Sequence, residues 1–278
     1  MAAIRTHTLP GRPSEGSPEP ASFRVELSDG LATTVHLAAY DLQTTEVRVA
    51  ALPRAEPLLA WCNRLTIADA IVGGFFVRAT GAPLGELRLA GIARPSVSFT
   101  RPWHALRSCV HVEAGAMRVA PRPHLPRNPR GDLLQAGPLL VANGLPVVVD
   151  GVDPEGFSAG RDQFDSDITA GRHPRAALGM TDGIALSVAC DGRGPADAGL
   201  TLGELAELMA ALGAREAINL DGGGSATLIC DARLVNRPRE QDGDDIPGGR
   251  PVCTALTFTP RTRPFGMGDE PSSTLTAA

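Results

Sequence analysis

The sequence predicts a single α+β domain that is mostly β-sheet and has few helices. Segments with strand character follow one another along most of the chain, and the one segment with strong helical spacing stands alone among them. The chain is also long enough, at 278 residues with 43% hydrophobic residues, to bury a substantial core. We expect this domain to span residues 22–260. The flanking segments 1–21 and 261–278 are rich in Pro, Ser, Gly or Thr, and we expect disordered tails there.

The first third of the chain contains four segments with strand character, at residues 32–39, 46–52, 67–77 and 86–89. Gly73 and Gly74 interrupt the third segment, and the Gly-Ala-Pro-Leu-Gly sequence at 81–85 predicts a turn before the fourth. Residues 94–132 then differ in composition, because seven arginines lie among six prolines and three histidines. This segment is interpreted as a long loop insertion, either functional or a solvated surface.

The second half begins with a hairpin signal, since the apolar residues 137–141 and 146–149 flank an Asn-Gly turn. Residues 150–174 are polar and predict a surface loop, and their clustered aspartates do not have the spacing of a calcium loop. Further strands are predicted at 176–180, 184–190, 217–220, 226–230 and 252–259. One helix lies among them. Thr201 and Glu204 form a capping box, leucines and Met209 recur at helical spacing, and Gly213 ends the helix.

Composition excludes several functions. The chain contains no lysine, a bias that a GC-rich genome explains, so Schiff-base chemistry and the Gly-Lys-Ser/Thr phosphate loop are excluded. The net charge of −5 argues against a nucleic-acid partner. No apolar run approaches the roughly 20 residues that span a bilayer, so we expect no membrane partner. No His/Asp/Glu cluster has metal-ligand spacing, and we expect neither a metal nor a cofactor.

Cysteine usage and the N-terminus predict a location. The five cysteines are odd in number, scattered, and never in a Cys-x-x-Cys pair, which indicates no complete disulfide framework. Residues 1–21 lack a basic segment followed by an apolar stretch, so no secretory signal is visible. Both observations favour a reducing cytoplasm.

The most informative stretch is residues 219–225, Asn-Leu-Asp-Gly-Gly-Gly-Ser, which places a carboxylate before three glycines. Three glycines forfeit side-chain packing, so they indicate an unusual backbone path or a close approach of N–H groups to a ligand. Consecutive N–H groups of this kind can form an anion-binding concavity. The alternative is a tight hairpin with Asp221 as its turn residue.

Several separate motifs resemble the phosphodiester glycosidase family, in the family's order and over about residues 70–258. The most specific is Ala-Ile-Asn-Leu-Asp-Gly-Gly-Gly-Ser-Ala-Thr at 217–227, with the Gly-Leu-Thr-Leu segment at 199–202 and its helix. The weaker motifs are Gly73-Gly74-Phe75-Phe76, Gly137-Pro138, Pro174-Arg175 with Gly179, Asp191-Gly192-Arg193, Asn236-x-Pro238 and Arg250. The resemblance implies a mixed, strongly curved β-sheet and hydrolysis of a sugar 1-phosphodiester at the anomeric carbon.

The chemistry of that reaction assigns roles to the residues. The leaving group is a phosphate monoester with a second pKa of about 6, so the need for a strong general acid weakens. Stabilising an oxocarbenium-like centre and the departing phosphate becomes the main task. The candidate catalytic residues are Asp221, Arg175 and Asp191. The candidate substrate- and phosphate-binding residues are Gly73, Gly74, Phe75, Asn219, Gly222, Gly223, Gly224, Ser225, Arg193 and Arg250.

Several of these residues also have a purely structural interpretation. Asp191 could be a turn residue, Arg175 a surface ion pair, the Gly73-Gly74 pair a bulge, and Phe75 a core side chain. The chain also departs from the family at Val72, where Asn is usual, and at Ala176, where Thr is usual. Three hypotheses follow, all with a phosphorylated sugar or nucleotide sugar as the small-molecule partner. The first is a cytoplasmic hydrolase that cuts the C–O bond, the second a catalytically silent binding module, and the third a phosphodiesterase that cuts P–O.

Overall fold

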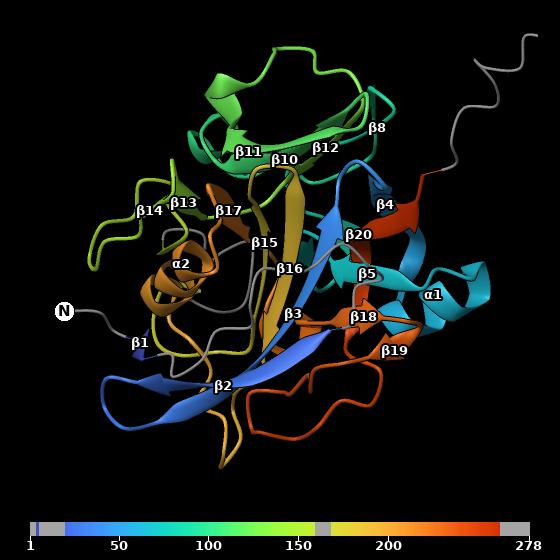
Figure 1. Cartoon of the computed structure of the whole chain (residues 1–278). Coiled ribbons are helices and arrows are strands. Elements are labelled where there is room, and N and C mark those ends of the chain that lie inside the picture. The colour runs from blue at the N-terminus through green and yellow to red at the C-terminus, as the bar shows by residue number, and fades with distance from the viewer. Residues whose placement is uncertain (1–3, 6–19, 159–167, 262–278) are drawn as a thin grey trace, which may run out of the picture.

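Three β-sheets and two α-helices make up the described chain (Figure 1). The computed structural model describes residues 4–5, 20–158 and 168–261. Most of the two expected tails, and the aspartates at 162, 165 and 167, lie outside the described residues. The sheets curl strongly and form one mostly β domain, which confirms the expected fold class.

The first sheet has eight strands in the order β1-β2-β3-β16-β15-β17-β13-β14. Their bounds are β1 (Ile4–Arg5), β2 (Ala21–Leu27), β3 (Ala32–Asp41), β13 (Leu139–Ala142), β14 (Leu145–Pro146), β15 (Arg175–Met180), β16 (Ile184–Cys190) and β17 (Glu216–Asn219). Each neighbouring pair is antiparallel. Antiparallel pairing brings the end of β17 beside the starts of β15 and β13, so motifs far apart in sequence meet at one edge.

The second sheet has the order β19-β18-β5-β20-β4, and the third has the order β11-β10-β12-β8-β9. The second comprises β4 (Thr45–Pro57), β5 (Asp69–Val72), β18 (Leu228–Cys230), β19 (Arg233–Leu234) and β20 (Pro251–Pro260). The third comprises β8 (Leu87–Leu89), β9 (Ile92–Ala93), β10 (Ser108–Glu113), β11 (Ala116–Pro121) and β12 (Asp132–Gln135). A small pair, β6 (Phe76–Val77) and β7 (Ala82–Pro83), lies outside all three.

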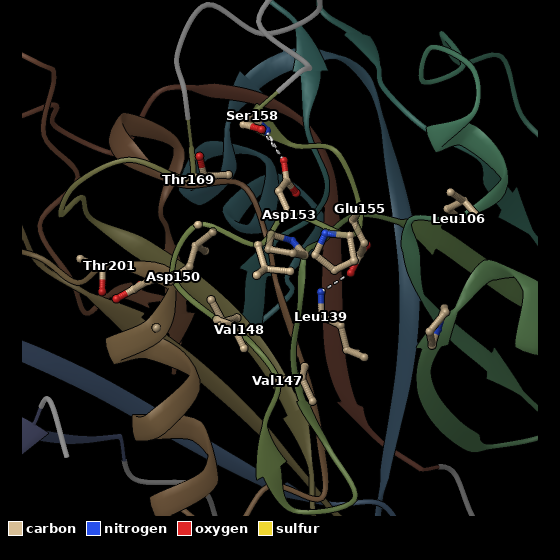
Figure 2. A pocket seen from close by; sticks show the side chains of 18 of the residues that line it. Leu106, Leu139, Val147, Val148, Asp150, Asp153, Glu155, Ser158, Thr169 and Thr201 are labelled. Atoms are coloured by element: carbon tan, nitrogen blue, oxygen red, sulfur yellow. Dashed lines mark hydrogen bonds between the residues drawn. The ribbon is translucent and has the colours of Figure 1, made fainter. Parts of the chain in front are cut away.

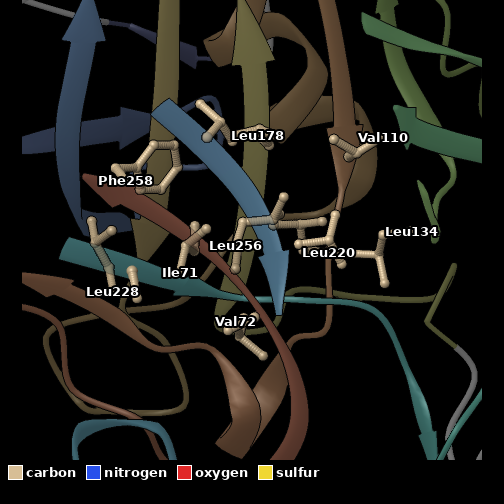
Figure 3. Packing of buried hydrophobic residues seen from close by; sticks show 14 of the residues in the cluster. Ile71, Val72, Val110, Leu134, Leu178, Leu220, Leu228, Leu256 and Phe258 are labelled. Atoms are coloured by element: carbon tan, nitrogen blue, oxygen red, sulfur yellow. The ribbon is translucent and has the colours of Figure 1, made fainter. Parts of the chain in front are cut away.

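The main core fills the space between the sheets (Figure 3). Leu178 and Leu220 enter it from the first sheet and its following loop, Ile71 and Leu256 from the second, and Val110 from the third. A second core lies under helix α2 (Leu202–Ala211), on the other face of the first sheet. The first sheet is therefore buried on both faces over its central strands, which explains their near-continuous apolar sequences.

Helix α2 confirms the predicted capping box. The Thr201 side chain accepts a hydrogen bond from the Glu204 N–H, and the Glu204 side chain accepts one from the Thr201 N–H. Gly213 follows the helix with φ +89°, a conformation that favours glycine. These signals are local in sequence, so they could be read without knowing the fold.

Four parts of the fold differ from the sequence-based expectation. Residues 94–132, expected to be a long loop, contain the hairpin of β10 and β11, whose strands carry one arginine, Arg118. Helix α1 (Leu58–Leu65) follows β4 and was not predicted. Its helical pattern is short, because only Leu58, Trp61 and Cys62 are buried. The expected second hairpin strand, 146–149, pairs only at Leu145–Pro146. In the expected tail, Ile4–Arg5 pair with β2.

Candidate active site

The predicted motifs meet at one end of the first sheet. The Asp221–Ser225 turn leaves β17, and the N–H of Gly223 donates to the carbonyl of Pro174 at the start of β15, at 2.8 Å. Asn219 exchanges backbone hydrogen bonds with the Gly137-Pro138 segment that precedes β13, each at 3.0 Å. Three segments that are separate in sequence therefore form one wall of a site.

The same turn also touches the second sheet. The Asp221 N–H donates to the carbonyl of Gly73, at 3.0 Å, and the Gly73 N–H donates to the carbonyl of Thr254, at 2.9 Å. A Cβ added at Gly73 would stand only 2.5 Å from Thr254 Oγ1, so the close approach requires glycine. Gly74 donates to that same hydroxyl oxygen. This pair of glycines lets β5 and β20 converge on Asp221.

The Asp221 carboxylate lies in a half-buried position near Ser225 and Arg250. Its Oδ1 accepts from the Gly222 N–H at 2.9 Å, while its Oδ2 is buried without a hydrogen-bond partner among the described residues. Burial raises the pKa of the carboxyl to about 6, and the hydroxyl of Ser225 and the charge of Arg250 limit the rise. The Ser225 hydroxyl lies near the carboxylate without completing a hydrogen bond to it. A carboxyl group with this pKa can exchange a proton near neutral pH.

Two arginines lie directly against the glycine turn. A Cβ at Gly223 would stand 3.1 Å from Nη1 of Arg193, and a Cβ at Gly224 would stand 2.9 Å from Nη2 of Arg250. Burial and the nearby charge of Arg250 lower the pKa of Arg193, as expected for cations gathered in one place. The glycines therefore create room for two guanidinium groups beside Asp221.

The anion-binding concavity expected from three consecutive N–H groups is only partly available. The N–H of Gly222 donates to Asp221 and that of Gly223 to Pro174, so both are used within the protein. This difference arises because the turn bends back onto β15, which the sequence of the turn alone does not reveal. The guanidinium groups of Arg193 and Arg250, which lie against Gly223 and Gly224, are further candidate donors for an anion.

Arg175 and Asn219 lie on the α2 side of the sheet, and both are buried. Arg175 donates from Nε to the carbonyl of Leu200 at 3.0 Å and from Nη2 to the carbonyl of Gly171 at 3.3 Å. Asn219 donates from Nδ2 to the carbonyls of Gly137 and Leu220, and its Oδ1 is buried without a hydrogen-bond partner among the described residues. These bonds orient both side chains at the base of the site.

Asp191 is placed differently from Asp221. Its Oδ2 lies 3.2 Å from Nε2 of His36, and its Oδ1 accepts from the N–H of Arg237 at 2.7 Å. His36 in turn contacts Ser22 through Nδ1, at 2.8 Å. Both carboxylate oxygens thus connect β16 to β3 and to the loop after β19, which is a structural use of this residue.

Phe75 belongs to a core cluster and does not form a stacking platform. It is 4% exposed, and its ring centroid lies 5.6 Å from that of Phe157. Arg107 lies over the ring of Phe157 at 3.9 Å and over that of Phe99 at 4.1 Å. The alternative interpretation of Phe75 as a core side chain agrees with this position.

The sequence missed four residues that surround Asp221. Arg78 is close enough for its charge to limit the rise in the pKa of Asp221. Burial, together with the nearby charge of Asp221, raises the pKa of the Cys253 thiol. Thr254 holds both Gly73 and Gly74, and Glu240 binds the guanidinium of Arg250 through Nε and Nη2. Arg78 follows the Gly-Gly-Phe-Phe motif by two residues and was the easiest to find. The others come from distant loops and strands.

A cavity of about 600 Å³ opens beside this end of the sheet (Figure 2). Neither Asp221 nor the glycine turn lines it, so the cavity is separate from the carboxylate. It reaches the site through Pro138, next to Asn219, and through Gly171, whose carbonyl binds Arg175. Among the described residues, no group of three or more His, Cys, Asp or Glu side chains is arranged to hold a metal ion.

A family model and several solved structures are similar to this chain. A family model described as phosphodiester glycosidase matches residues 66–259. The catalytic domain of zebrafish N-acetylglucosamine-1-phosphodiester alpha-N-acetylglucosaminidase, in a form auto-inhibited by its pro-peptide, has a similar structure. It has a TM-score of 0.66 and 18% identity, over 90% of this chain and 86% of that one. No curated protein sequence matches the chain.

Two bacterial structures share the fold. A hypothetical protein from Synechocystis has a TM-score of 0.60 and 18% identity, over 86% of this chain and 61% of that one. A putative exported protein from Burkholderia pseudomallei has a TM-score of 0.56 and 19% identity, over 83% of this chain and 74% of that one.

The predicted cytoplasmic location is contradicted, because the structural neighbours include a protein described as exported. The five cysteines are all buried and unpaired, so they reflect packing as small apolar side chains and do not report on a compartment. None of the helices in the described ranges is long and apolar enough to cross a bilayer.

Proposed function

Because this chain belongs to the phosphodiester glycosidase family, we propose that it hydrolyses the anomeric C–O bond of a glycosyl 1-phosphodiester. The products are a free sugar and a phosphate monoester. The zebrafish relative is named for N-acetylglucosamine, so an N-acetylglucosamine 1-phosphodiester is the first substrate to test.

The observation that carries this proposal is the placement of Asp221 among arginines. A carboxyl group whose pKa is raised to about 6 lies at a turn that two guanidinium groups contact. The reaction of a glycosyl phosphodiester develops two opposite charges, and such a site would stabilise both. The developing positive charge on the sugar ring faces the carboxylate, and the departing phosphate faces Arg193 and Arg250.

The proposed reaction needs one ionised carboxylate. The bond from C1 to the bridging oxygen breaks, and its electron pair leaves with the phosphate monoester. The oxygen of a water molecule bonds to C1, and the Asp221 carboxylate takes up a proton of that water. Since the phosphate leaves as a stable anion, no second carboxylate has to donate a proton. The hydrogen bonds from His36 and Arg237 to Asp191 are consistent with such a scheme.

Val72 and Ala176, which replace the family's usual polar residues, are both fully buried in the main core. Apolar side chains at these positions pack between the sheets, so they do not take polar groups away from the surface beside Asp221. This placement supports catalysis over a silent binding module.

Hydrolysis in oxygen-18 water tests the proposal directly. Label in the released sugar is expected, whereas label in the phosphate would mean P–O cleavage and would overturn the glycosidase mechanism. Asp221→Asn should lower kcat by at least about a hundredfold, the scale of general acid–base catalysis. Asp182→Asn is the matched control, because that side chain is exposed on a turn. Tight ligand binding with no turnover in the wild type would instead indicate a binding module.

A further inference from the structure

The cavity beside the site has an apolar lining that nothing in the proposed chemistry uses. Val149 and Val152, which line it, are 59% and 58% exposed. The other exposed or half-exposed apolar residues of the lining include Leu106, Leu139, Val147, Val148 and Pro154. Exposed apolar side chains gathered around one concave surface mark a binding site more often than a random surface. The volume of about 600 Å³ is also typical of a ligand site.

The charges around the cavity exclude an anion from its interior. Among the described residues that line it, the ionisable ones are all acidic, namely Asp150, Asp153 and Glu155. Glu155 accepts hydrogen bonds from the N–H groups of Ser108 and Leu139, and burial raises the pKa of its carboxyl. Asp153 accepts from the N–H and the hydroxyl of Ser158, as Figure 2 shows. The cavity therefore suits a neutral, apolar group.

Arg175 connects this cavity to the glycine turn. Its Nη2 donates to the carbonyl of Gly171 in the cavity wall, at 3.3 Å. At the other end, its Cδ lies 4.0 Å from where a Cβ of Gly222 would be. A phosphate that faces Arg193 and Arg250 at this turn would thus be separated from the cavity wall by the buried side chain of Arg175. The two oxygen substituents of a phosphodiester point away from the phosphorus in different directions, which matches this arrangement.

We propose that the cavity binds the alcohol that the phosphate carries beyond the scissile bond, and that this alcohol is an apolar hydrocarbon. The inference rests on the proposed function, because it assumes that the phosphate lies between the cavity and Asp221. The sugar lies on the Asp221 side of the phosphate, and the hydrocarbon lies among Val147, Val149 and Val152.

Two measurements test this subsite. The first compares turnover of N-acetylglucosamine 1-(octyl phosphate) with that of the methyl ester, and the octyl ester should have a kcat/KM at least tenfold higher. Each buried methylene contributes about threefold to fourfold in affinity, so a few buried methylenes account for that ratio. The second compares binding of octyl phosphate and methyl phosphate by calorimetry, with the same expected ratio and no dependence on catalysis.

A matched pair of variants locates the effect. Val152→Asp should lower the octyl-to-methyl ratio toward one, because it places a charge against the hydrocarbon. Ile92→Asp, on β9 and 62% exposed, should leave the ratio as in the wild type. Both positions are exposed, so neither change should prevent folding.

The outcomes separate this inference from the proposed function. Turnover of both esters with equal kcat/KM would refute the subsite and leave the proposed hydrolase function supported. Tighter binding of a sugar phosphate than of octyl phosphate would also refute the subsite. Preferential binding of octyl phosphate that Val152→Asp abolishes, without turnover of either ester, would support the subsite and refute the hydrolase.

Discussion

A side chain added at Gly224 would stand 2.9 Å from Nη2 of Arg250, and the Gly224 carbonyl accepts a hydrogen bond from the Arg250 N–H at 3.0 Å. Both the backbone and the side chain of the arginine therefore lie against this one glycine. The side chain of Ile246 approaches the same position, at 2.6 Å. The absence of a Cβ at residue 224 is what allows the guanidinium to reach the vicinity of Asp221.

Gly224→Ala should therefore displace the Arg250 guanidinium and weaken phosphate binding. We expect KM to rise at least about tenfold, since a charge-assisted hydrogen bond contributes about 1.5–3 kcal/mol. Steady-state kinetics on a glycosyl phosphodiester measures the change. Gly30→Ala is the control. Gly30 has φ +84° and open space around it, so that variant should lose about 1 kcal/mol of stability with KM unchanged. Equal KM values for both variants would refute the role of Gly224.

Asp221→Asn should stabilise the protein above pH 6. The pKa of this carboxyl is about 6 in the folded protein against an ordinary 3.8, so folding favours the protonated form. The stabilising contribution is complete below pH 3.8 and is lost as the pH rises through 6. A neutral amide avoids that loss, so the free energy of unfolding should rise by about 1–3 kcal/mol at pH 7.5 and change little at pH 4. Urea unfolding at both pH values measures it, and equal gains at both would contradict the assignment.

Arg250→Gln should move the pH profile of the reaction. In the wild type, kcat/KM should increase with pH through about 6, because the ionised Asp221 is the active form. The charge of Arg250 lowers the pKa of Asp221, so its removal should shift the midpoint to higher pH. Arg233→Gln, on an exposed position of β19, should leave the midpoint in place. A downward shift in the Arg250 variant would show that another group controls the profile.

Arg107→Lys should destabilise the fold by about 2–3 kcal/mol despite keeping the positive charge. The Arg107 guanidinium lies between Phe99 and Phe157 and donates to the carbonyls of Glu155 and Gly156, at 2.9 and 2.7 Å. An ammonium group cannot reproduce this planar stacking with two hydrogen bonds. The exposed Arg118→Lys on β11 should change stability by less than about 0.5 kcal/mol, and thermal or urea unfolding of both variants measures the difference.

The parts of the fold that the sequence predicts depend on neighbouring residues. Thr201 and Glu204 are three residues apart, and the strands β15 and β16 are joined by a short turn, so their signals lie within one stretch of chain. In the third sheet the hairpin of β10 and β11 was missed, because it lies in a segment whose composition is rich in arginine and proline. Pairing of β10 with β12 stabilises strands that the amino-acid composition of this segment does not predict.

In the candidate site, too, the residues that could be identified from the sequence lie close together along the chain. The sequence singled out Asp221 and the glycines as candidates, because three consecutive glycines are unusual in any local structure. The use of Asp191 was not, since its partners His36 and Arg237 come from β3 and from a loop about 46 residues later in the chain. Glu240 and Cys253 were missed for the same reason. The way in which the sheets pack decides which side chains lie near each carboxylate. The sequence of a short segment does not contain that information.

The hydrogen bond from the Asp221 N–H to the Gly73 carbonyl joins the last residues of a strand in the first sheet to those of a strand in the second. The proposed catalytic carboxylate is thus located on a boundary between two sheets, where a few backbone bonds resist their separation. A substrate bound by Arg193, which follows β16 of the first sheet, and by Arg250, which precedes β20 of the second, would act as a cross-link across that boundary. Bound substrate should therefore help to hold the two sheets together. We expect the protein to be most resistant to proteolysis while it is turning over substrate.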